Sequence, residues 1–250
     1  MYSVIIDSQI FKKKLAFDFR ISLSSNLNCI DTDEVVDSLN NFIEDKKINK
    51  KFVLNQMFNY ISGEFEISRL KISFTLEGIT FRREKDYNRI YLAIGTNKGN
   101  RKGNIENLLN ILTESNKIFL DDASSVYESD PVGFKKQNKF YNMVVKARTT
   151  LKPLLLLSFI KKIEYKMGRR WNKTNHPRII DIDILYYDDK IINNKELKIP
   201  HKEIYNRDFV LIPLIEIDSK FRDPTNFNKL EKYVDNYNSL NKVLDKKELL

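Results

Sequence analysis

The 250-residue chain is 42% hydrophobic and carries a net charge of +9, which is enough apolar material for one large domain or two smaller ones with cores of their own. A single cysteine excludes an internal disulfide framework, and two histidines are too few for a Cys/His zinc cluster, so a metal here would be held by oxygen. The basic residues form no cluster interleaved with aromatics, and no apolar run reaches roughly 18 residues, so we expect a cytoplasmic protein without nucleic-acid or membrane partners.

The first predicted unit covers residues 1–86. Residues 10–25 alternate between apolar and polar side chains, which is typical of a strand. Helical patterns follow over 31–45, opened by Asp and Thr as caps, and over 50–65. Residues 67–81 then alternate cleanly again. The unit is therefore predicted as a strand, helix, helix, strand module.

A charged stretch, residues 82–89, is predicted to be the hinge to a second unit, residues 87–222. Strands and helices alternate in this unit, which predicts an α+β domain with helices packed on a largely antiparallel sheet. Strands are predicted over 89–97, 118–129, 138–151 and 180–187, helices over 101–115 and 153–168, and a short helix or strand over 206–217. The polar residues 223–250 are predicted to be a C-terminal tail with a loosely docked helix.

Two aspartates stand two residues apart in an isoleucine-rich strand, "RIIDIDILYY". Side chains alternate along a strand, so Asp181 and Asp183 share one face while Ile180, Ile182 and Ile184 share the other. Two like charges on a half-buried strand need a cation between them or water around them. A divalent metal is the natural candidate.

Fixed positive charges lie close to these aspartates in the sequence. The predicted helix 153–168 carries Glu164 and leads into Arg169 and Arg170, and His176 and Arg178 precede the acidic strand. Arginine and metal together suit phosphoryl or pyrophosphoryl transfer, because negative charge develops on phosphate oxygens in both reactions. Pairing of these charges with one another at the surface is the alternative interpretation.

Other nucleotide-binding signatures are absent. The sequence contains no G-x-x-x-x-G-K-[ST], and residues 95–100, "GTNKGN", do not supply G-x-G-x-x-G, which disfavours P-loop and Rossmann chemistry. A tight loop is predicted over 127–134, and the following strand places Asn142 on the same face as Phe140. An amide beside an aromatic ring suits a flat polar heterocycle.

Six sequence blocks resemble the family of 6-hydroxymethyl-7,8-dihydropterin pyrophosphokinases: "YLAIGTN", "VYESDPVG", "FYNMVV", "IEYKMGR", "HPRIIDIDILYYDD" and "IPHKEIYNRDFVLIPLIEI". The resemblance covers residues 89–222 and implies a ferredoxin-like α+β fold. It also implies ATP as co-substrate, two Mg²⁺ ions, and transfer of pyrophosphate to the hydroxymethyl oxygen of the pterin in folate synthesis, with release of AMP.

The resemblance assigns roles to residues position by position. It implies that Asp181 and Asp183 bind magnesium and that Arg169 and Arg178 act with them in catalysis. The implied pterin contacts are Ser129, Asp130, Val132, Phe140, Asn142 and Phe209. The implied ATP contacts are Glu164, Arg169, Arg178, Ile184, His201 and Arg207.

The first unit resembles dihydroneopterin aldolase, a small α+β, T-fold-like domain, in its order of elements and a few residues. Asn55 and Leu76 stand where that family carries a Glu and a Lys, and residues 24–34 lack its Tyr. We also expect the segment before Ser8 to be too short for a further strand. The unit is thus predicted to be a degenerate aldolase-like domain that supports homo-oligomer assembly. A bifunctional enzyme is the alternative.

Overall fold

The computed structural model describes residues 2–12, 15–25, 37, 57, 59–61, 69–76, 79–133, 135–170, 176–235 and 240–248. The chain divides into two compact units, residues 1–87 and 88–250. None of the described helices is both long enough and apolar enough to span a membrane.

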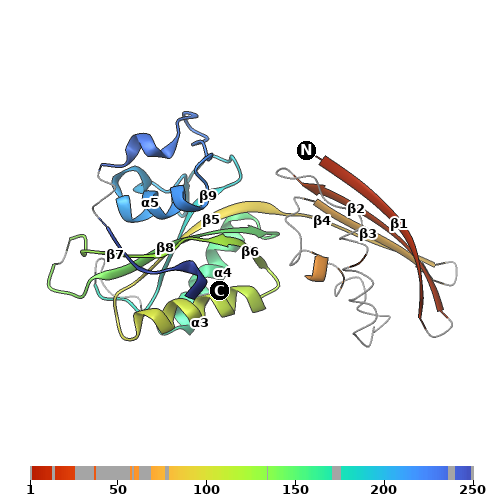
Figure 1. Cartoon of the computed structure of the whole chain (residues 1–250), viewed down its shortest axis with the longest axis horizontal. Helices are drawn as coiled ribbons and strands as arrows, with labels where there is room; N and C mark the ends of the chain where they lie inside the picture. Colours follow the sequence, from red (N-terminus) through yellow and green to blue (C-terminus); the bar gives the residue numbers. More distant parts are fainter. Residues whose placement is uncertain are drawn as a thin grey trace. The chain divides into compact units, whose positions relative to one another are not determined.

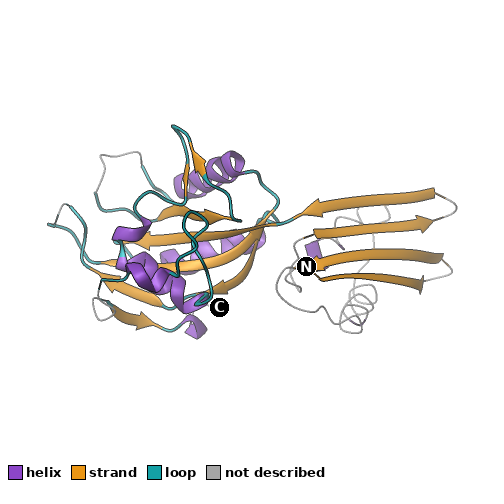
Figure 2. Ribbon diagram, turned by 90° about the horizontal axis from the view of Figure 1, so that it is seen from above, coloured by secondary structure: helices purple, strands orange, loops and turns teal. Residues whose placement is uncertain are grey.

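The first unit contains a four-stranded antiparallel sheet whose strands are neighbours in chain order (Figure 2). The strands are β1 (Tyr2–Lys12), β2 (Leu15–Ser25), β3 (Arg69–Leu76) and β4 (Ile79–Asp86). Leu70 and Ile72 on β3 are buried, whereas Arg69 is exposed, which confirms the predicted alternation there. Met57 and Ile61, in described helical positions, are buried as well.

Two strand predictions for this unit are wrong. Residues 10–25 are not one strand, because β1 ends at Lys12 and β2 begins at Leu15. The segment before Ser8 is also strand, since β1 starts at Tyr2, continues through Ser8 and pairs with β2 along its whole length. Both strands have the same two-residue period, so alternation alone does not show where one strand ends and the next begins. Most of the two predicted helices, 31–45 and 50–65, lies outside the described residues.

The predicted hinge 82–89 contains the boundary between the two units, but it is strand rather than loop. Its first residues belong to β4, and only Tyr87 separates β4 from the next strand. Two of the charged residues in this stretch, Glu84 and Asp86, pair with Arg69 on the neighbouring strand β3. The Nε atom of Arg69 lies 2.5 Å from a carboxylate oxygen of Asp86 and 3.8 Å from one of Glu84. Charged side chains are common on edge strands, where they discourage pairing with another chain.

The second unit alternates strands and helices as predicted (Figure 1). Its main elements are β5 (Asn88–Thr96), α3 (Arg101–Glu114), β6 (Ile118–Ala123), β7 (Val126–Ser129), β8 (Phe140–Thr149), α4 (Pro153–Lys166), β9 (Asp181–Tyr187), α5 (Asp208–Ile217) and β12 (Asn241–Leu244). Two short strands, β10 (Ile192–Asn193) and β11 (Lys198–Ile199), form a separate pair, and 3-10 turns cover Ile204–Asn206, Leu230–Tyr233 and Lys246–Glu248.

The main sheet has the strand order β12-β7-β8-β5-β9, with β6 also paired to β8, and all the described pairs are antiparallel. The run from β5 to β9 is strand, helix, strands, helix, strand, which is the split β-α-β arrangement called ferredoxin-like. The α+β prediction is confirmed for this unit.

The sheet is covered on both faces (Figure 1). Leucine and isoleucine side chains of α3 and α4 pack with Ile90, Leu92 and Ile94 of β5 on one face. Helix α5 packs against Tyr91 and Ala93 on the other face. The two hydrophobic cores follow the two-residue alternation of the strands. The α5 face is the one that carries the site described below.

The structure confirms two predicted helices and decides between helix and strand for a third segment. Helices α3 and α4 confirm the predictions over 101–115 and 153–168, and α5 shows that 206–217 is a helix. The chain leaves α4 at Gly168, whose φ of 94° is readily adopted only by glycine. The predicted strand 118–129 is two strands, since Ser124 and Ser125 lie between β6 and β7.

The predicted tail, residues 223–250, begins with a fully buried carboxylate rather than a loose segment. Asp223 accepts hydrogen bonds from the hydroxyls of Tyr186 at 2.7 Å and Tyr205 at 2.6 Å, and from the backbone N–H of Thr225 at 2.7 Å. Further on, β12 pairs with β7 and extends the sheet. The described part of the tail forms a strand and 3-10 turns, so the predicted helix is not found there.

Asp223 should make the unfolding free energy depend on pH. Burial alone would raise the pKa of Asp223, but hydrogen bonds from Thr225, Tyr205 and Tyr186 outweigh it and hold the pKa below its usual value. A lowered folded-state pKa stabilises the fold fully above the unfolded-state pKa of about 4, and this stabilisation is lost as the pH falls through the folded-state pKa.

We therefore expect Asp223→Asn to lower the free energy of unfolding by about 1 to 3 kcal/mol at pH 7 and to flatten its fall in acid. Urea titrations between pH 2.5 and 7 measure both effects. Asp235→Asn, at an exposed position, is the matched control and should change neither. A wild-type acid profile retained by Asp223→Asn would show that this carboxylate is not the titrating group.

Candidate active site

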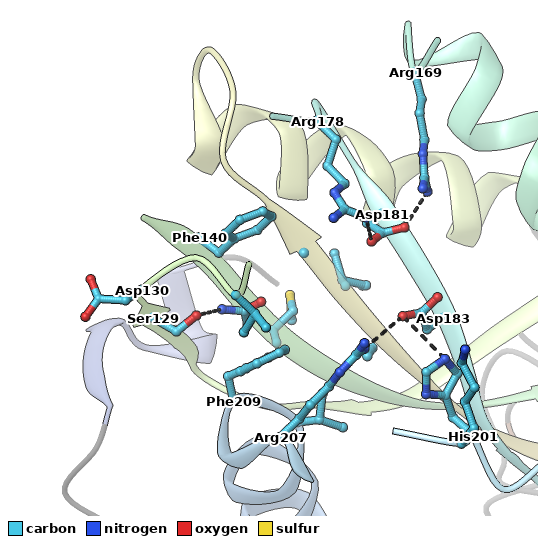
Figure 3. Close-up of a pocket in the computed structure, with 18 of the residues that line it drawn as sticks. Ser129, Asp130, Phe140, Arg169, Arg178, Asp181, Asp183, His201, Arg207 and Phe209 are labelled. Carbon is cyan, nitrogen blue, oxygen red and sulfur yellow. Dashed lines mark hydrogen bonds and ion pairs between the residues drawn. The ribbon is translucent and has the colours of Figure 1, made fainter. Parts of the chain in front are cut away.

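One cavity of about 290 Å³ lies on the α5 face of the main sheet (Figure 3). Its floor is formed by Ala93, Ile94 and Gly95 near the end of β5. The predicted site residues that line it are Ser129, Asp130, Val132, Phe140, Asn142, Arg169, Arg178, Asp181, Asp183, His201, Arg207 and Phe209. Residues from β7, β8, β9 and α5, far apart in the sequence, thus converge on one hollow.

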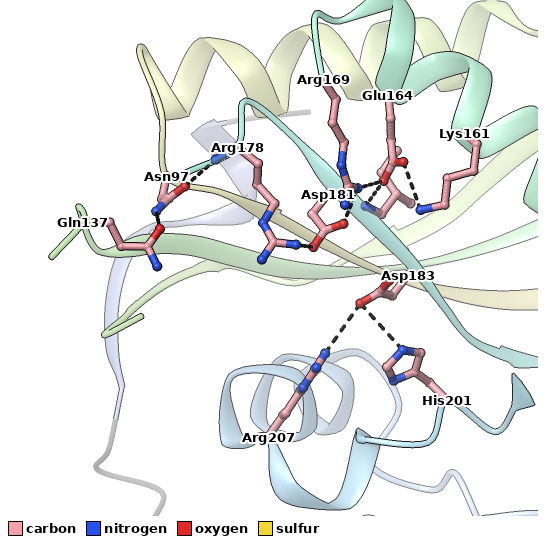
Figure 4. A network of polar contacts seen from close by, with 11 residues as sticks. Asn97, Gln137, Lys161, Glu164, Arg169, Arg178, Asp181, Asp183, His201 and Arg207 are labelled. Atoms are coloured by element: carbon pink, nitrogen blue, oxygen red, sulfur yellow. Dashed lines mark hydrogen bonds and ion pairs between the residues drawn. The ribbon is translucent and has the colours of Figure 1, made fainter. Parts of the chain in front are cut away.

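The cavity has an end rich in charge, formed by Asp181, Asp183 and the cations around them, which we term the charged end. Arg169 donates to one carboxylate oxygen of Asp181, and Arg178 donates to the other (Figures 3 and 4). Both arginine side chains are about three-quarters buried, so solvent screens these ion pairs only partly. The two arginines supply positive charge beside the aspartates.

Glu164 on α4 supports this arrangement from behind. Its side chain is 3% exposed and accepts from Arg169, from the Lys161 ammonium at 2.9 Å and from the backbone N–H of Ile182 at 2.8 Å (Figure 4). Burial raises the pKa of Glu164, while Lys161 and Arg169 act in the opposite direction. Glu164 fixes α4 to β9 and holds Arg169 at the edge of the cavity.

Asp183 has a looser set of partners. One of its carboxylate oxygens lies 3.5 Å from Arg207 Nη1 and 3.8 Å from His201 Nε2. The backbone N–H of Glu203 donates to His201 Nδ1, so the neutral imidazole carries its proton on Nε2, toward Asp183. Burial lowers the pKa of His201, Asp183 opposes that shift and Arg207 adds to it. This histidine is therefore neutral at pH 7.

The opposite end of the cavity, which we term the aromatic end, contains Phe140, Phe209 and Asn142. Phe140 comes from β8 and Phe209 from α5, and both rings point into the hollow (Figure 3). Asn142 is 6% exposed and donates to Ser129 Oγ at 2.9 Å. A Cβ atom at Gly95 would lie 3.4 Å from Asn142 Oδ1, so the β5 backbone lies directly beneath this amide.

Asn97, at 1% exposure, joins the two ends. Its Oδ1 accepts the backbone N–H of Arg178 at 2.8 Å, and its Nδ2 donates to Gln137 Oε1 at 2.9 Å and to the carbonyl of Asn138 at 3.1 Å (Figure 4). The segment before β8 and the segment before β9 are thus fixed to each other through one buried amide. Sequence reasoning did not select Asn97, because nothing local distinguishes it from the other asparagines of an Asn-rich chain.

Two predicted ATP contacts do not line this cavity. Ile184 is 3% exposed and packs in the core on the α3 and α4 face, and Glu164 lies behind Arg169 as described. Conversely, Lys161 and Lys202 line the cavity although the sequence did not single them out. Lys161 is three residues before Glu164 on α4, so a helical pattern around Glu164 would have found it. Lys202 has no comparable signal among so many lysines.

The carboxylate ligands at the charged end suit a magnesium ion that is bound together with a phosphate group. Mg²⁺ is usually held by one or two carboxylates plus substrate phosphates rather than by an all-protein cage. Asp181 and Asp183 supply two carboxylates on one wall of the cavity, as their alternation predicts. Within the described part of the chain, no three His, Cys, Asp or Glu side chains converge to hold a metal. The site therefore fits a metal–phosphate complex better than a free ion.

The sequence that forms this cavity matches a known protein family. A family model described as 7,8-dihydro-6-hydroxymethylpterin-pyrophosphokinase (HPPK) matches residues 91–219, which span β5 to α5 and every wall of the cavity. The chain belongs to this family. The HPPK match begins within β5, so it leaves the first unit unassigned.

Three relatives show the same similarity to proteins of folate synthesis. The chain is 46% identical over 138 residues to the folic acid synthesis protein FOL1 of Dictyostelium discoideum, covering 55% of this chain and 21% of that protein. It is 44% identical over 133 residues to the bifunctional protein FolKE of Lactococcus lactis, covering 53% and 38%. It is 41% identical over 144 residues to the 2-amino-4-hydroxy-6-hydroxymethyldihydropteridine pyrophosphokinase of Aquifex aeolicus, covering 58% and 89%. The chain thus spans well under half of the first two relatives and most of the third.

Removal of Glu164 should destabilise the second unit. Glu164→Ala leaves Lys161, Arg169 and the N–H of Ile182 without their buried acceptor, and we expect a loss of about 2 to 4 kcal/mol in the free energy of unfolding. Chemical denaturation at pH 7 measures it. Glu114→Ala, at an exposed position near the end of α3, is the control and should stay within about 0.5 kcal/mol of wild type. A loss no larger than that of the control would contradict a supporting role for Glu164.

Proposed function

We propose that the protein transfers the pyrophosphoryl group of ATP to the hydroxymethyl oxygen of 6-hydroxymethyl-7,8-dihydropterin, releasing AMP, as a step of folate synthesis. The observation that carries this proposal is one cavity with two chemically different ends. The aromatic end suits a flat heterocycle, and the charged end suits a polyphosphate. Family membership supplies the identity of the two substrates.

At the aromatic end, Phe140 and Phe209 would stack on the pterin ring, and the Asn142 amide would form hydrogen bonds with the polar edge of that ring. In the structure Ser129 Oγ accepts from Asn142 Nδ2, which leaves Asn142 Oδ1 for a donor on the ligand. Asp130 and Val132 would complete the rim of this pocket. The stacking holds the hydroxymethyl group toward the charged end.

At the charged end, Arg169 and Arg178 would exchange Asp181 for phosphate oxygens. A guanidinium group can bind two such oxygens at once, and its charge stabilises the negative charge that develops during transfer. Arg207 and the Nε2–H of His201 would contact the same polyphosphate, because both already face Asp183. Glu164 would act through Arg169 rather than by direct contact.

Asp181 and Asp183 would hold two Mg²⁺ ions together with the ATP phosphates. When bound, these ions neutralise phosphate charge and favour attack at the β-phosphorus. In the reaction, the pterin hydroxyl oxygen forms a bond to that phosphorus while the bond to the oxygen bridging the α- and β-phosphates breaks; AMP leaves with this oxygen, and the hydroxyl proton is released to water. Binding both substrates in one cavity lowers the barrier by bringing the reacting atoms together.

For the first unit we propose a degenerate aldolase-like assembly module. The order β1, β2, described helical residues, β3 and β4 supports the resemblance to an aldolase fold, and its edge strands could pair between copies. Asn55 and Leu76, in place of a Glu and a Lys, argue against aldolase chemistry. Release of glycolaldehyde from dihydroneopterin by the whole chain would favour the bifunctional alternative instead.

The direct test of the main proposal is to incubate the protein with ATP, Mg²⁺ and 6-hydroxymethyl-7,8-dihydropterin and to separate the nucleotides. AMP should appear only when both the pterin and magnesium are present, in equal amount to a pterin diphosphate. ADP with a pterin monophosphate, or no nucleotide turnover, would overturn the proposal.

Asn142→Ala should weaken pterin binding selectively. The variant leaves the polar edge of the ring without its partner in a buried pocket, for which we expect a loss of about 1 to 3 kcal/mol in the free energy of pterin binding. Binding of a non-hydrolysable ATP analogue should stay within about twofold of wild type. Calorimetry with each ligand separately measures both. Equal losses for the two ligands would place Asn142 outside the pterin pocket.

A further inference from the structure

We propose that Arg101, the first residue of α3, is a positioning residue for the aromatic end of the cavity. It lies on the opposite side of the main sheet and holds β7 and β8 together at the point where both enter the pocket. This inference deepens the function proposed above and rests on the assignment of the aromatic end to the pterin.

Arg101 contacts both strands at once. Its Nη1 donates to Glu128 Oε1 on β7 at 2.9 Å and to the backbone carbonyl of Lys139 at 2.9 Å. Its guanidinium carbon lies 3.7 Å from the centre of the Tyr141 ring on β8, a close stacking distance. These contacts use the charge of the guanidinium group, both hydrogens of one nitrogen and the flat face of the side chain.

Each of the three partners is adjacent to a residue of the aromatic end. Glu128 precedes Ser129, and Lys139 and Tyr141 flank Phe140. In the ladder between β7 and β8, Glu128 is opposite Tyr141 and Ser129 is opposite Phe140. Arg101 therefore fixes the last two paired positions of the hairpin, immediately before the segment that contributes Asp130 and Val132 to the cavity.

The alternation of strand side chains explains how a residue outside the cavity can act on it. Ser129 and Phe140 point to the α5 face, so Glu128 and Tyr141 point to the α3 face, where Arg101 lies. A shift of Glu128 or Tyr141 moves the neighbouring backbone and displaces the Phe140 ring. Stacking with a flat substrate depends on that ring's position.

The Arg101 contacts are better protected than ordinary surface ion pairs. The side chains of Arg101 and Glu128 are 26% and 23% exposed, so salt and water screen the pair only in part. The charged end, in contrast, is built from other elements, with Arg169 following α4, the aspartates on β9 and Arg207 leading into α5. A defect at Arg101 should therefore affect the pterin more than ATP.

The experiment compares Arg101→Gln and Arg101→Lys with a matched control, Lys102→Gln. Lys102 is the next residue of α3, with a side chain that is 43% exposed and 3.7 Å from Glu106. Calorimetry gives the dissociation constants for the pterin and for a non-hydrolysable ATP analogue, and steady-state kinetics give KM for each substrate and kcat. Thermal unfolding of each variant reports on the fold.

We expect Arg101→Gln to raise the pterin dissociation constant and KM roughly tenfold while the values for the ATP ligand change less than about twofold. Arg101→Lys should fall between wild type and Arg101→Gln, because lysine keeps the charge opposite Glu128 but has no planar group to stack on Tyr141. Lys102→Gln should match wild type.

If the wild-type protein binds the pterin and forms AMP, two results would overturn the inference about Arg101 while the proposed function stands. One is unchanged pterin binding in Arg101→Gln. The other is an equal loss for both ligands together with a lowered melting temperature, which would make Arg101 a general stabilising residue. If Arg101→Gln unfolds, Glu128→Gln should show the same selective loss in milder form. Failure of the wild-type protein to bind the pterin would overturn the proposed function and this inference with it.

Discussion

The charged end depends on one interaction, the clasp of Asp181 between Arg169 and Arg178. Two aspartates on one strand face would repel each other in a half-buried site, and the arginine charges beside Asp181 offset that repulsion. The same arginines are thereby held at the cavity wall, ready to exchange one anionic partner for another. The clasp both stabilises the free protein and positions the groups that the proposed reaction needs.

Several elements serve this clasp. Gly168 turns the chain at the end of α4, so that Arg169 returns alongside Glu164. Glu164 then ties Arg169 to β9 through the N–H of Ile182. On the other side, Asn97 accepts the backbone N–H of Arg178 and fixes it to the segment before β8. The arginines are thus positioned by buried acceptors, which lowers the entropy that they would lose on binding a ligand.

Local patterns predicted the parts of the site that lie within one element. The spacing of Asp181 and Asp183 predicted a shared face, and the pocket shows both carboxylates on it. Asn142 and Phe140 were likewise predicted on one face of a strand, and both line the aromatic end. These predictions succeed because side-chain direction in a strand is fixed by backbone geometry alone.

Alternation did not reveal where strands end. It continues through the β1–β2 hairpin and across the break between β6 and β7, so residues 10–25 and 118–129 each read as one strand. The pairing of His201 and Arg207 with Asp183, and of Asn97 with Arg178, depends on how separate elements pack. Asp223 was assigned to a polar tail for the same reason, since two of its partners, Tyr186 and Tyr205, lie in other segments.

If phosphate replaces Asp181 as the partner of Arg169 and Arg178, nucleotide binding without magnesium should depend on Asp181. A non-hydrolysable ATP analogue should be titrated into wild-type protein, Asp181→Asn and the control Asp130→Asn, whose side chain is 82% exposed at the aromatic end, in the presence of a chelator. Because Asp181→Asn releases Arg169 and Arg178 from their anionic partner, its magnesium-free affinity should rise by roughly tenfold over wild type, while added magnesium should help it less. Magnesium-free affinity that is equal in all three proteins would show that Asp181 does not compete with phosphate for these arginines and would contradict the account.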